Sequence, residues 1–176
     1  MDLNEFENRP LIQAAVIVLY ERASDSLILT KRSENLRAHP GEISFSGGSW
    51  EEGDENLYAT ALRELNEEVG ISADRVTLIR ELKTEQTLLG SIIYPWFASI
   101  ESIHPYYLNP DEVTRIIAVP MPLVQSSRNY QDIFVERCGF RFKTCEFAFK
   151  DDWIWGATAR IMRQLIRHPE RSEGPP

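Results

Sequence analysis

The 176-residue sequence has little cysteine, little excess basic charge and no long apolar segment. Its two cysteines, Cys138 and Cys145, are too few to build a framework of disulfides. The longest apolar run, residues 11–20, is too short to span a bilayer and contains Gln13. The first ten residues are acidic and lack the basic and apolar segments of a signal peptide. We therefore expect a cytoplasmic protein with reduced thiols.

The net charge of −8 excludes a general affinity for nucleic acids or anionic membranes, which require a basic surface. The proportions of apolar residues (43%) and charged residues (26%) are those of an ordinary soluble globular protein. If the substrate is an anion, a local feature rather than the overall charge must attract it. A bound metal ion is the obvious candidate, and the expected partner is a small molecule.

The length fits one domain, which we expect over residues 1–168, with residues 169–176 as a disordered tail. The apolar pattern predicts a hairpin formed by residues 14–20 and 27–30, followed by a short strand at 43–46 and a helix over 55–69 that Gly70 ends. Further strands are predicted at 75–83, 91–100, 113–119, 131–136 and 140–149. A last helix is predicted from Asp152, as its cap, to about residue 167. This order indicates an α/β (α+β) domain with mixed strands.

The helix at 55–69 carries three glutamates near one line. With Glu64 set at 0°, Glu67 lies at about 300° and Glu68 at about 40° around the axis. Glu68 therefore falls between Leu57 and Ala61, on the rim of the apolar face. A solvated acidic face would instead place all three carboxylates opposite that stripe, and only Glu67 comes close to that position.

Crowding these carboxylates costs free energy unless something neutralises them. Like charges at i, i+4 destabilise a helix, and apolar surroundings raise the cost. A divalent cation reverses the balance, because oxygen ligands bind it well. The Gly47-Gly48 pair upstream can let backbone carbonyls approach such an ion. The pattern favours a metal site.

Residues 47–71, GGSWEEGDENLYATALRELNEEVGI, resemble the Nudix box, Gly-x5-Glu-x7-Arg-Glu-U-x-Glu-Glu-x-Gly-U with U aliphatic. Residues 63–71 match its second half throughout. The first half departs: counting forward from Gly48 gives Asp54 as the acid, whereas counting back from Arg63 gives Glu55 with Ser49 in place of glycine. We interpret this difference as a one-residue insertion that leaves the metal-binding half intact.

Residues 27–48, LILTKRSENLRAHPGEISFSGG, resemble the signature of the coenzyme A diphosphatase branch of the Nudix hydrolases. The matching residues are Arg32, Ser33, Arg37, Gly41, Phe45, Gly47 and Gly48. Ser46 replaces the usual proline of that signature. The similarity extends over about residues 12–167, although 84–108 match little.

These resemblances imply a Nudix fold, in which a mixed β-sheet lies between helices and a loop and helix carry the box. They imply a metal-dependent hydrolase that cleaves the diphosphate of coenzyme A or acyl-CoA. Its products would be adenosine 3′,5′-bisphosphate and 4′-phosphopantetheine or the acyl form, with Mg²⁺ or Mn²⁺ as cofactor. Two alternatives remain: a Nudix hydrolase of NADH, ADP-ribose or a nucleoside triphosphate, and a module that binds a nucleotide without cutting it.

The resemblance also assigns roles in the catalytic site. Glu67 and Glu68 are expected to be the core metal ligands, and Glu64 a further ligand or the group that polarises the attacking water. Gly47 can add its backbone carbonyl. The expected role of Arg63 is to orient the glutamates. Glu112 is the candidate for a distant catalytic acid, with a solvated loop acid as its alternative and Asp111 as its substitute.

Arg32 and Arg37 are the candidates for binding the phosphates of the substrate, because arginine makes bidentate phosphate contacts. Lys31, Ser33 and His39 are expected to assist. Trp153 and Trp155 can contact a substrate, but packing in the core is the expected role for this pair. The sequence does not distinguish a monomer from a homodimer.

Overall fold

The computed structural model describes residues 12–87, 90–137 and 139–166. Eight strands form the larger sheet: β1 (Gln13–Glu21), β2 (Ser26–Arg32), β3 (Ile43–Ser44), β4 (Ser46–Ser49), β5 (Thr77–Glu81), β6 (Glu85–Gln86), β7 (Ile92–Ile100) and β8 (Val113–Pro120). Three strands form the smaller sheet: β9 (Tyr130–Arg137), β10 (Phe140–Phe149) and β11 (Asp152–Trp155). The helices are α2 (Leu57–Val69), α3 (Met121–Val124) and α4 (Gly156–Arg163), with 3₁₀ turns η1 (Ala73–Arg75) and η2 (Ser127–Asn129).

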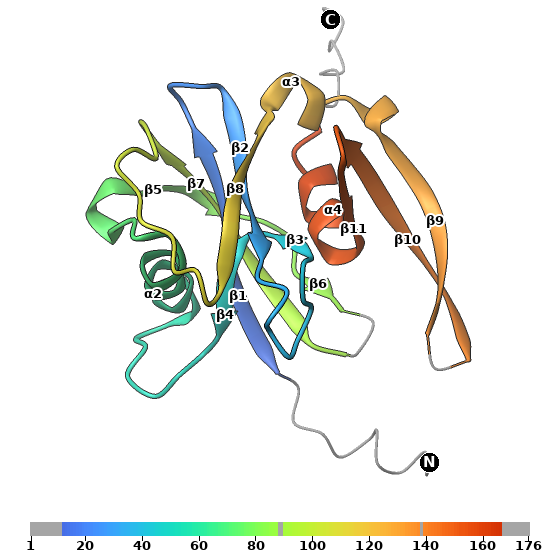
Figure 1. The fold of residues 1–176 in the computed structure, drawn as a ribbon, viewed down its shortest axis with the longest axis horizontal. Coiled ribbons are helices and arrows are strands. Elements are labelled where there is room, and N and C mark those ends of the chain that lie inside the picture. Colours follow the sequence, from blue (N-terminus) through green and yellow to red (C-terminus); the bar gives the residue numbers. More distant parts are fainter. Residues whose placement is uncertain (1–11, 88–89, 138, 167–176) are drawn as a thin grey trace, which may run out of the picture.

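The larger sheet is mixed. Strands β1 and β2 form the expected antiparallel hairpin, and β1 also pairs with β7 in parallel along its whole length. The strand order is β3-β2-β1-β7-β5, with β4 added to β1, β6 to β7 and β8 to β2. Figure 1 shows α2 against one side of this sheet, while α4 and the smaller sheet lie on the other side. The expected mixed sheet between helices is confirmed.

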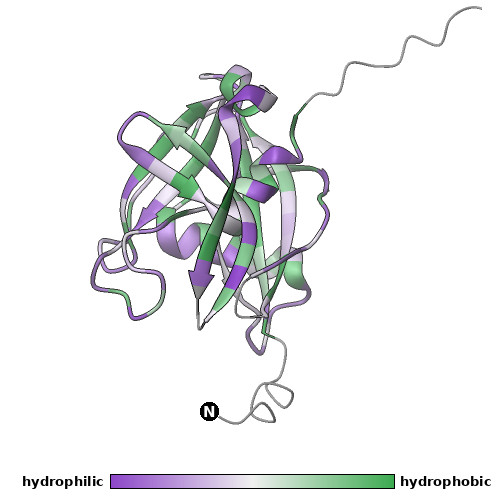
Figure 2. Cartoon of the chain, turned by 90° about the vertical axis from the view of Figure 1, so that its right-hand side faces the viewer, coloured by the Kyte–Doolittle hydropathy of each residue, from purple (hydrophilic) through white to green (hydrophobic). Residues whose placement is uncertain are grey.

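Alternation along β1 explains this layering. Ala15, Ile17 and Leu19 point to the side of α2 and join one buried apolar cluster, whereas Val16 and Val18 point to the opposite cluster. The first cluster contains Ala61, Leu65 and Val69 of α2, and the second contains Phe147, Ile154, Ile161 and Met162. The central strands are therefore apolar on both faces, while Figure 2 shows hydrophilic residues concentrated on the loops.

Helix α2 begins and ends on residues suited to its termini. Asn56 is the N-cap, and its side-chain oxygen accepts a hydrogen bond from the backbone N–H of Ala59 at 2.9 Å. Gly70 ends the helix with φ 69°, a left-handed conformation that favours glycine. The expected C-terminus at Gly70 is confirmed, and the helix starts at Leu57 rather than at residue 55.

The predicted start of the last helix is wrong. Residues 152–155 form β11, which pairs with β10, and α4 begins only at Gly156 and ends at Arg163. Alternation explains the error, because Ile154 is buried while Trp153 beside it is exposed. The carboxylate of Asp152 forms an ion pair with Arg115 rather than capping a helix.

Several sequence predictions fall outside the described residues. These are the disordered tail at residues 169–176 and the expected reduced state of Cys138. The other cysteine, Cys145, is a buried free thiol. Within the part of the chain that the structure describes, the helices are too short or too polar for any of them to cross a membrane.

Candidate active site

Three carboxylates from two parts of the chain converge beside α2. Glu64 and Glu68 lie one turn apart on α2, and Glu112 comes from the loop before β8. Each offers an oxygen, and these oxygens lie within 4.8 Å of one another. Glu68 is only 4% exposed, and its Oε2 has no hydrogen-bond partner among the described residues. An unpartnered buried carboxylate oxygen is costly, which makes it a natural ligand for a cation.

Backbone hydrogen bonds fix the loop that carries Glu112. The N–H of Asn109 donates to the carbonyl of Glu68 at 3.0 Å, in the last turn of α2. The N–H of Glu112 donates to the carbonyl of Asn109 at 3.0 Å. At the end of β2, the N–H of Ser33 donates to the carbonyl of Glu112 at 2.8 Å. The loop that carries Glu112 is therefore attached both to the end of α2 and to the end of β2.

The electrostatics of the cluster also favour a cation. Burial and, after it, the neighbouring charges of Glu64 and Glu112 together raise the pKa of Glu68 to about 8, although a hydrogen bond from Ser46 and the charge of Arg32 act in the opposite direction. Burial likewise raises the pKa of Glu64, although Arg63 opposes this. At neutral pH the metal-free Glu68 thus retains a proton that a divalent cation would displace. The donor set, one buried and two half-buried carboxylates, fits Mg²⁺ or Mn²⁺.

Arg63 connects the loop after β4 to the catalytic helix. Its Nε donates to Oδ1 of Asp54 at 3.0 Å, and one terminal nitrogen donates to Oδ2 of Asp54 at 3.2 Å and to the carbonyl of Ser49 at 3.2 Å. The other terminal nitrogen donates to Glu64 at 3.1 Å and to Glu67 at 3.0 Å. Hydrogen bonds from Arg63 lower the pKa of Asp54 to about 2. Arg63 therefore joins Asp54 to Glu64 and Glu67, and its role in orienting metal ligands stays a prediction.

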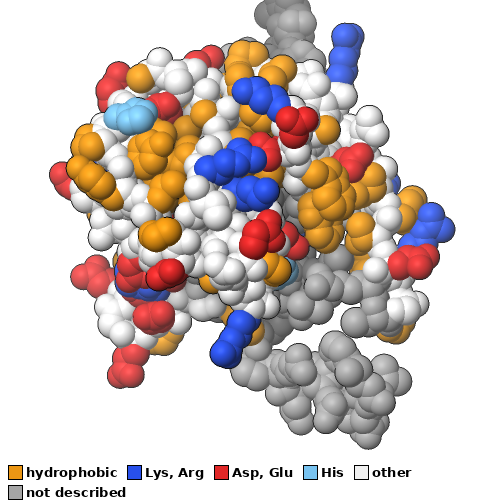
Figure 3. Space-filling view, in the orientation of Figure 1, with side chains coloured by type: hydrophobic (Ala, Val, Ile, Leu, Met, Phe, Trp, Pro, Cys, Tyr) orange, Lys and Arg blue, Asp and Glu red, His pale blue; other side chains and the backbone are white. Residues whose placement is uncertain are grey.

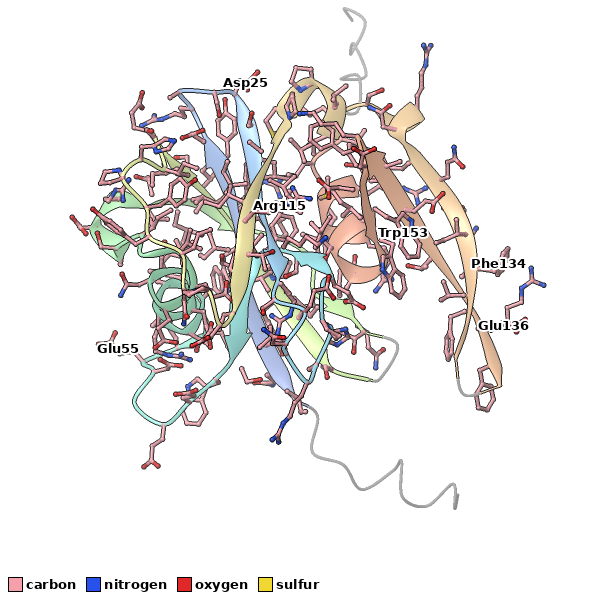
Figure 4. All side chains as sticks on the ribbon, viewed as in Figure 1. Asp25, Glu55, Arg115, Phe134, Glu136 and Trp153 are labelled. Carbon is pink, nitrogen blue, oxygen red and sulfur yellow. The ribbon has the colours of Figure 1, made fainter. Side chains whose placement is uncertain are left out.

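The structure distinguishes the two acids that the sequence left open. Asp54 pairs with Arg63 and also accepts a hydrogen bond from the hydroxyl of Thr60 at 2.9 Å. Glu55 is exposed and, as Figure 4 shows, lies at the edge of the molecule near the start of α2. Counting forward from Gly48 is therefore the register that the structure follows, and the extra residue falls after Asp54.

We predict that Asp54→Asn lowers kcat/KM by about 10- to 100-fold, because residues that orient metal ligands typically contribute that much. The amide cannot accept two charge-assisted hydrogen bonds from Arg63. Steady-state kinetics at several Mg²⁺ concentrations measure the effect. Glu55→Gln removes an adjacent acid from the solvent side and is the matched control. Equal losses in the two variants would contradict the role of Asp54.

The two glycines of β4, Gly47 and Gly48, allow neighbouring groups to approach the backbone of this strand closely. A Cβ added at Gly47 would overlap the carbonyl of Ala15 on β1, and one added at Gly48 would overlap the carboxylate of Glu64. Gly48 therefore makes room for the side chain of Glu64. Metal binding by the carbonyl of Gly47 stays a prediction.

Glu67 lies outside the group of three carboxylates. Its side chain is 49% exposed and forms an ion pair with Arg63 at 3.0 Å. This is the position that the helix angle indicates, farther from the apolar face than Glu68. Its role as a core ligand stays a prediction and requires its carboxylate to leave Arg63.

A pocket of about 410 Å³ adjoins the carboxylates through Gly47, Gly48 and Arg32. Its walls come from β1, from the loop before β3, from the segment between β6 and β7, and from the first turn of α4. The volume is within the range of small-molecule sites. Gly48 lines the pocket and lies against the carboxylate of Glu64, so the pocket begins beside the carboxylates although none of the three lines it.

The predicted substrate-binding residues are not all brought together. Arg32 is half-buried and lines the pocket, and its terminal nitrogen donates to the carbonyl of Ala38 at 3.4 Å. Arg37 is exposed and Lys31 half-buried, and neither lines the pocket. Ser33 is 2% exposed, and its hydroxyl accepts a hydrogen bond from the N–H of Asn35 at 3.3 Å. Ser33 thus contacts its own loop and Glu112 rather than open space.

Sequence reasoning missed the contribution of the C-terminal region to the pocket. Trp155, Thr158 and Arg160 line it. The expectation that the tryptophan pair packs in the core is wrong for Trp153, which is 52% exposed. The sequence did contain a signal for this strand, because Trp153, Ile154 and Trp155 point alternately to opposite faces when the segment is extended.

Comparison with known proteins identifies the family. The sequence of residues 10–122 matches the protein family described as the NUDIX domain. A Yersinia pestis protein described as an uncharacterized Nudix hydrolase, NudL, is 32% identical over 154 residues, which cover 88% of this chain and 77% of that protein.

Solved structures share the fold. A MutT/nudix family protein from Enterococcus faecalis gives a TM-score of 0.60 at 14% identity, covering 94% of this chain and 68% of that one. The NUDIX domain of Shewanella oneidensis NrtR, complexed with ADP ribose, gives 0.52 at 20% identity, covering 69% and 85%. The extent of the family match and the 32% identity show that this chain belongs to the NUDIX family and is a Nudix hydrolase.

Proposed function

We propose that this Nudix hydrolase cleaves the diphosphate bond of coenzyme A or an acyl-CoA with Mg²⁺ or Mn²⁺. One observation carries the proposal: the segment that resembles the coenzyme A signature, residues 27–48, leads directly into the catalytic site. Its Arg32 lines the pocket, and its Gly48 lies against the carboxylate of Glu64. The part of the chain that resembles a substrate signature is therefore in a position to contact a substrate.

The chemistry requires neutralisation of the substrate. The anionic oxygens of a diphosphate repel a nucleophile, and a bound divalent cation supplies charge neutralisation, orientation of the attacking water and a lower pKa for it. Glu64, Glu68 and Glu112 would hold the cation, with Glu67 as a further ligand after it leaves Arg63. Arg32 would stabilise the negative charge that develops on the diphosphate. Glu64 is either a ligand or the group that polarises the water.

The products would be adenosine 3′,5′-bisphosphate and 4′-phosphopantetheine or its acyl form. A panel of coenzyme A, NADH, ADP-ribose and ATP, with the products identified by mass spectrometry, tests the proposal. We expect coenzyme A to have the highest kcat/KM. A higher value for ADP-ribose or NADH would refute the coenzyme A assignment while leaving the Nudix chemistry intact.

Dephospho-CoA, which lacks only the 3′-phosphate, is the sharpest probe within this panel. We predict that it reacts about 10- to 100-fold more slowly than coenzyme A, because hydrogen bonds to a charged group contribute about 1.5–3 kcal/mol. Arg32→Ala, which removes a contact to the diphosphate, should slow both substrates alike, whereas Arg37→Ala should narrow that difference. Arg128→Ala, which removes an exposed arginine on η2, is the control and should preserve it. Equal rates for the two substrates would show that Arg37 does not bind the 3′-phosphate.

A further inference from the structure

We infer that the pocket receives the uncharged pantetheine arm of the substrate, and that the stacked indoles of Trp155 and Trp153 bind the acyl group beyond it. The inference rests on the proposed function and identifies the structural basis of acyl-chain specificity. It follows from the charge of the pocket walls, from the position of the pocket beside Gly48 and Arg32, and from a pair of aromatic rings of which one lines the pocket and the other is exposed.

The walls of the pocket combine apolar and uncharged polar side chains. The apolar residues include Ala14, Val16, Phe45 and Ile93, and the uncharged polar residues include Ser44, Thr87, Ser91 and Thr158. The pantetheine arm has the same character, because it carries methyl groups, a hydroxyl and two amides but no charge. The adenosine arm bears a 3′-phosphate and would require positive charge at this place.

Two basic side chains of the pocket, Arg160 and His39, already form ion pairs or hydrogen bonds within the protein. Arg32 lies at the end of the pocket beside Gly48. Arg160 donates through Nε to Glu85 at 2.8 Å and through its terminal nitrogens to the hydroxyl of Thr144 at 2.7 Å and the carbonyl of Gln86 at 2.6 Å. His39 pairs with Glu42 at 2.8 Å. A phosphate group in this pocket would find the charges of Arg160 and His39 neutralised by Glu85 and Glu42. An uncharged pantetheine arm does not require these charges.

Both tryptophans belong to β11, and one of them, Trp155, lines the pocket. Trp155 and Trp153 are two residues apart on β11, so their side chains point to the same face, while Ile154 points into the core. The rings stack with their centroids 5.2 Å apart and an angle of 12° between their planes. Trp155 lines the pocket and Trp153 extends the aromatic surface outside it.

Trp153 presents its ring rather than a polar group. Its Nε1 donates to Oε2 of Glu146 at 2.6 Å, which satisfies the indole N–H, and the side chain is 52% exposed. Figure 3 shows exposed hydrophobic side chains over the region of the smaller sheet, and Figure 4 shows Trp153 on that sheet. An acyl chain attached to the end of the pantetheine arm would leave the pocket past Trp155 and cover this surface.

Kinetics with coenzyme A, acetyl-CoA and hexanoyl-CoA test the inference on the whole protein. With the wild type, hexanoyl-CoA should exceed acetyl-CoA in kcat/KM by about tenfold, because each added methylene becomes partly buried. The gain should appear in KM rather than kcat. Trp153→Ala should bring the hexanoyl-to-acetyl ratio close to one, and Trp153→Phe, which retains an aromatic ring, should preserve most of the ratio.

Phe134→Ala is the matched control, since it removes an aromatic ring that is 56% exposed on β9 of the same sheet and lies away from Trp153 in Figure 4. It should leave the ratio unchanged. A wild-type ratio near one, or an equal fall in the ratio for Phe134→Ala and Trp153→Ala, overturns the inference while coenzyme A hydrolysis stands. If the wild type cleaves none of the three compounds, the proposed function itself fails, and the inference with it.

Discussion

A Glu68→Gln variant is expected to lose roughly a thousandfold in hydrolytic rate, because several kcal/mol of transition-state stabilisation depend on a correctly held cation. The same substitution should stabilise the metal-free protein by about 1–3 kcal/mol at pH 7.5. It removes a buried ionisable carboxyl whose neighbours are Glu64 and Glu112, at the cost of an imperfectly paired amide. Turnover under saturating Mg²⁺ and denaturant unfolding with a chelator measure the two effects.

The Glu67→Gln variant distinguishes the effect of losing a metal ligand on activity from the effect of removing a buried carboxyl on stability. If Glu67 is a ligand, its variant also loses activity, but the metal-free protein should not gain stability. Its carboxylate is about half exposed and pairs with Arg63, and such exposed pairs contribute about 0–1 kcal/mol. A stability gain as large as that of Glu68→Gln would contradict the difference in burial. Near-wild-type turnover by Glu68→Gln would refute the assignment of the metal site.

Local geometry explains what the sequence predicted well. Because α2 is a regular helix, the angular position of Glu68 between Leu57 and Ala61 was sufficient to predict burial at the rim of its apolar face. The hairpin of β1 and β2 and the glycine end of α2 also depend on neighbouring residues only. Elements of this kind need no knowledge of the rest of the fold.

The site itself depends on contacts that no local pattern contains. Glu112 reaches Glu68 because backbone hydrogen bonds attach its loop to the end of α2. Whether Asp54 or Glu55 pairs with Arg63 depends on how the loop after Gly48 folds, and counting residues allowed both.

The C-terminal segment shows a third cause of error. Ile154, Ile161 and Leu165 have helical spacing, yet Trp153 and Trp155 also alternate with Ile154 as in a strand. Pairing with β10 decided between the two patterns, and this contact placed Trp155 in the pocket.

Stability without metal should depend on pH in the opposite direction to that of an ordinary paired carboxylate. The pKa of Glu68 is raised from 4.5 to about 8, so between these values the folded protein holds a proton that the unfolded chain has lost. Stability therefore falls as pH rises through this window. The raised pKa of Glu64 acts in the same direction, while the lowered pKa of Asp54 acts only below about pH 4.

We predict that the metal-free protein loses about 3–4 kcal/mol of unfolding free energy between pH 5 and pH 8, as the shift of one buried carboxyl requires. Saturating Mg²⁺ should restore most of the loss at pH 8 and add little at pH 5, because the cation binds the ionised cluster. Urea unfolding at fixed ionic strength, with and without Mg²⁺, measures both, and Glu68→Gln should flatten the profile. A metal-free stability that stays level or rises between pH 5 and pH 8 would show that Glu68 is ionised without a cation, and that burial does not prepare this site for metal.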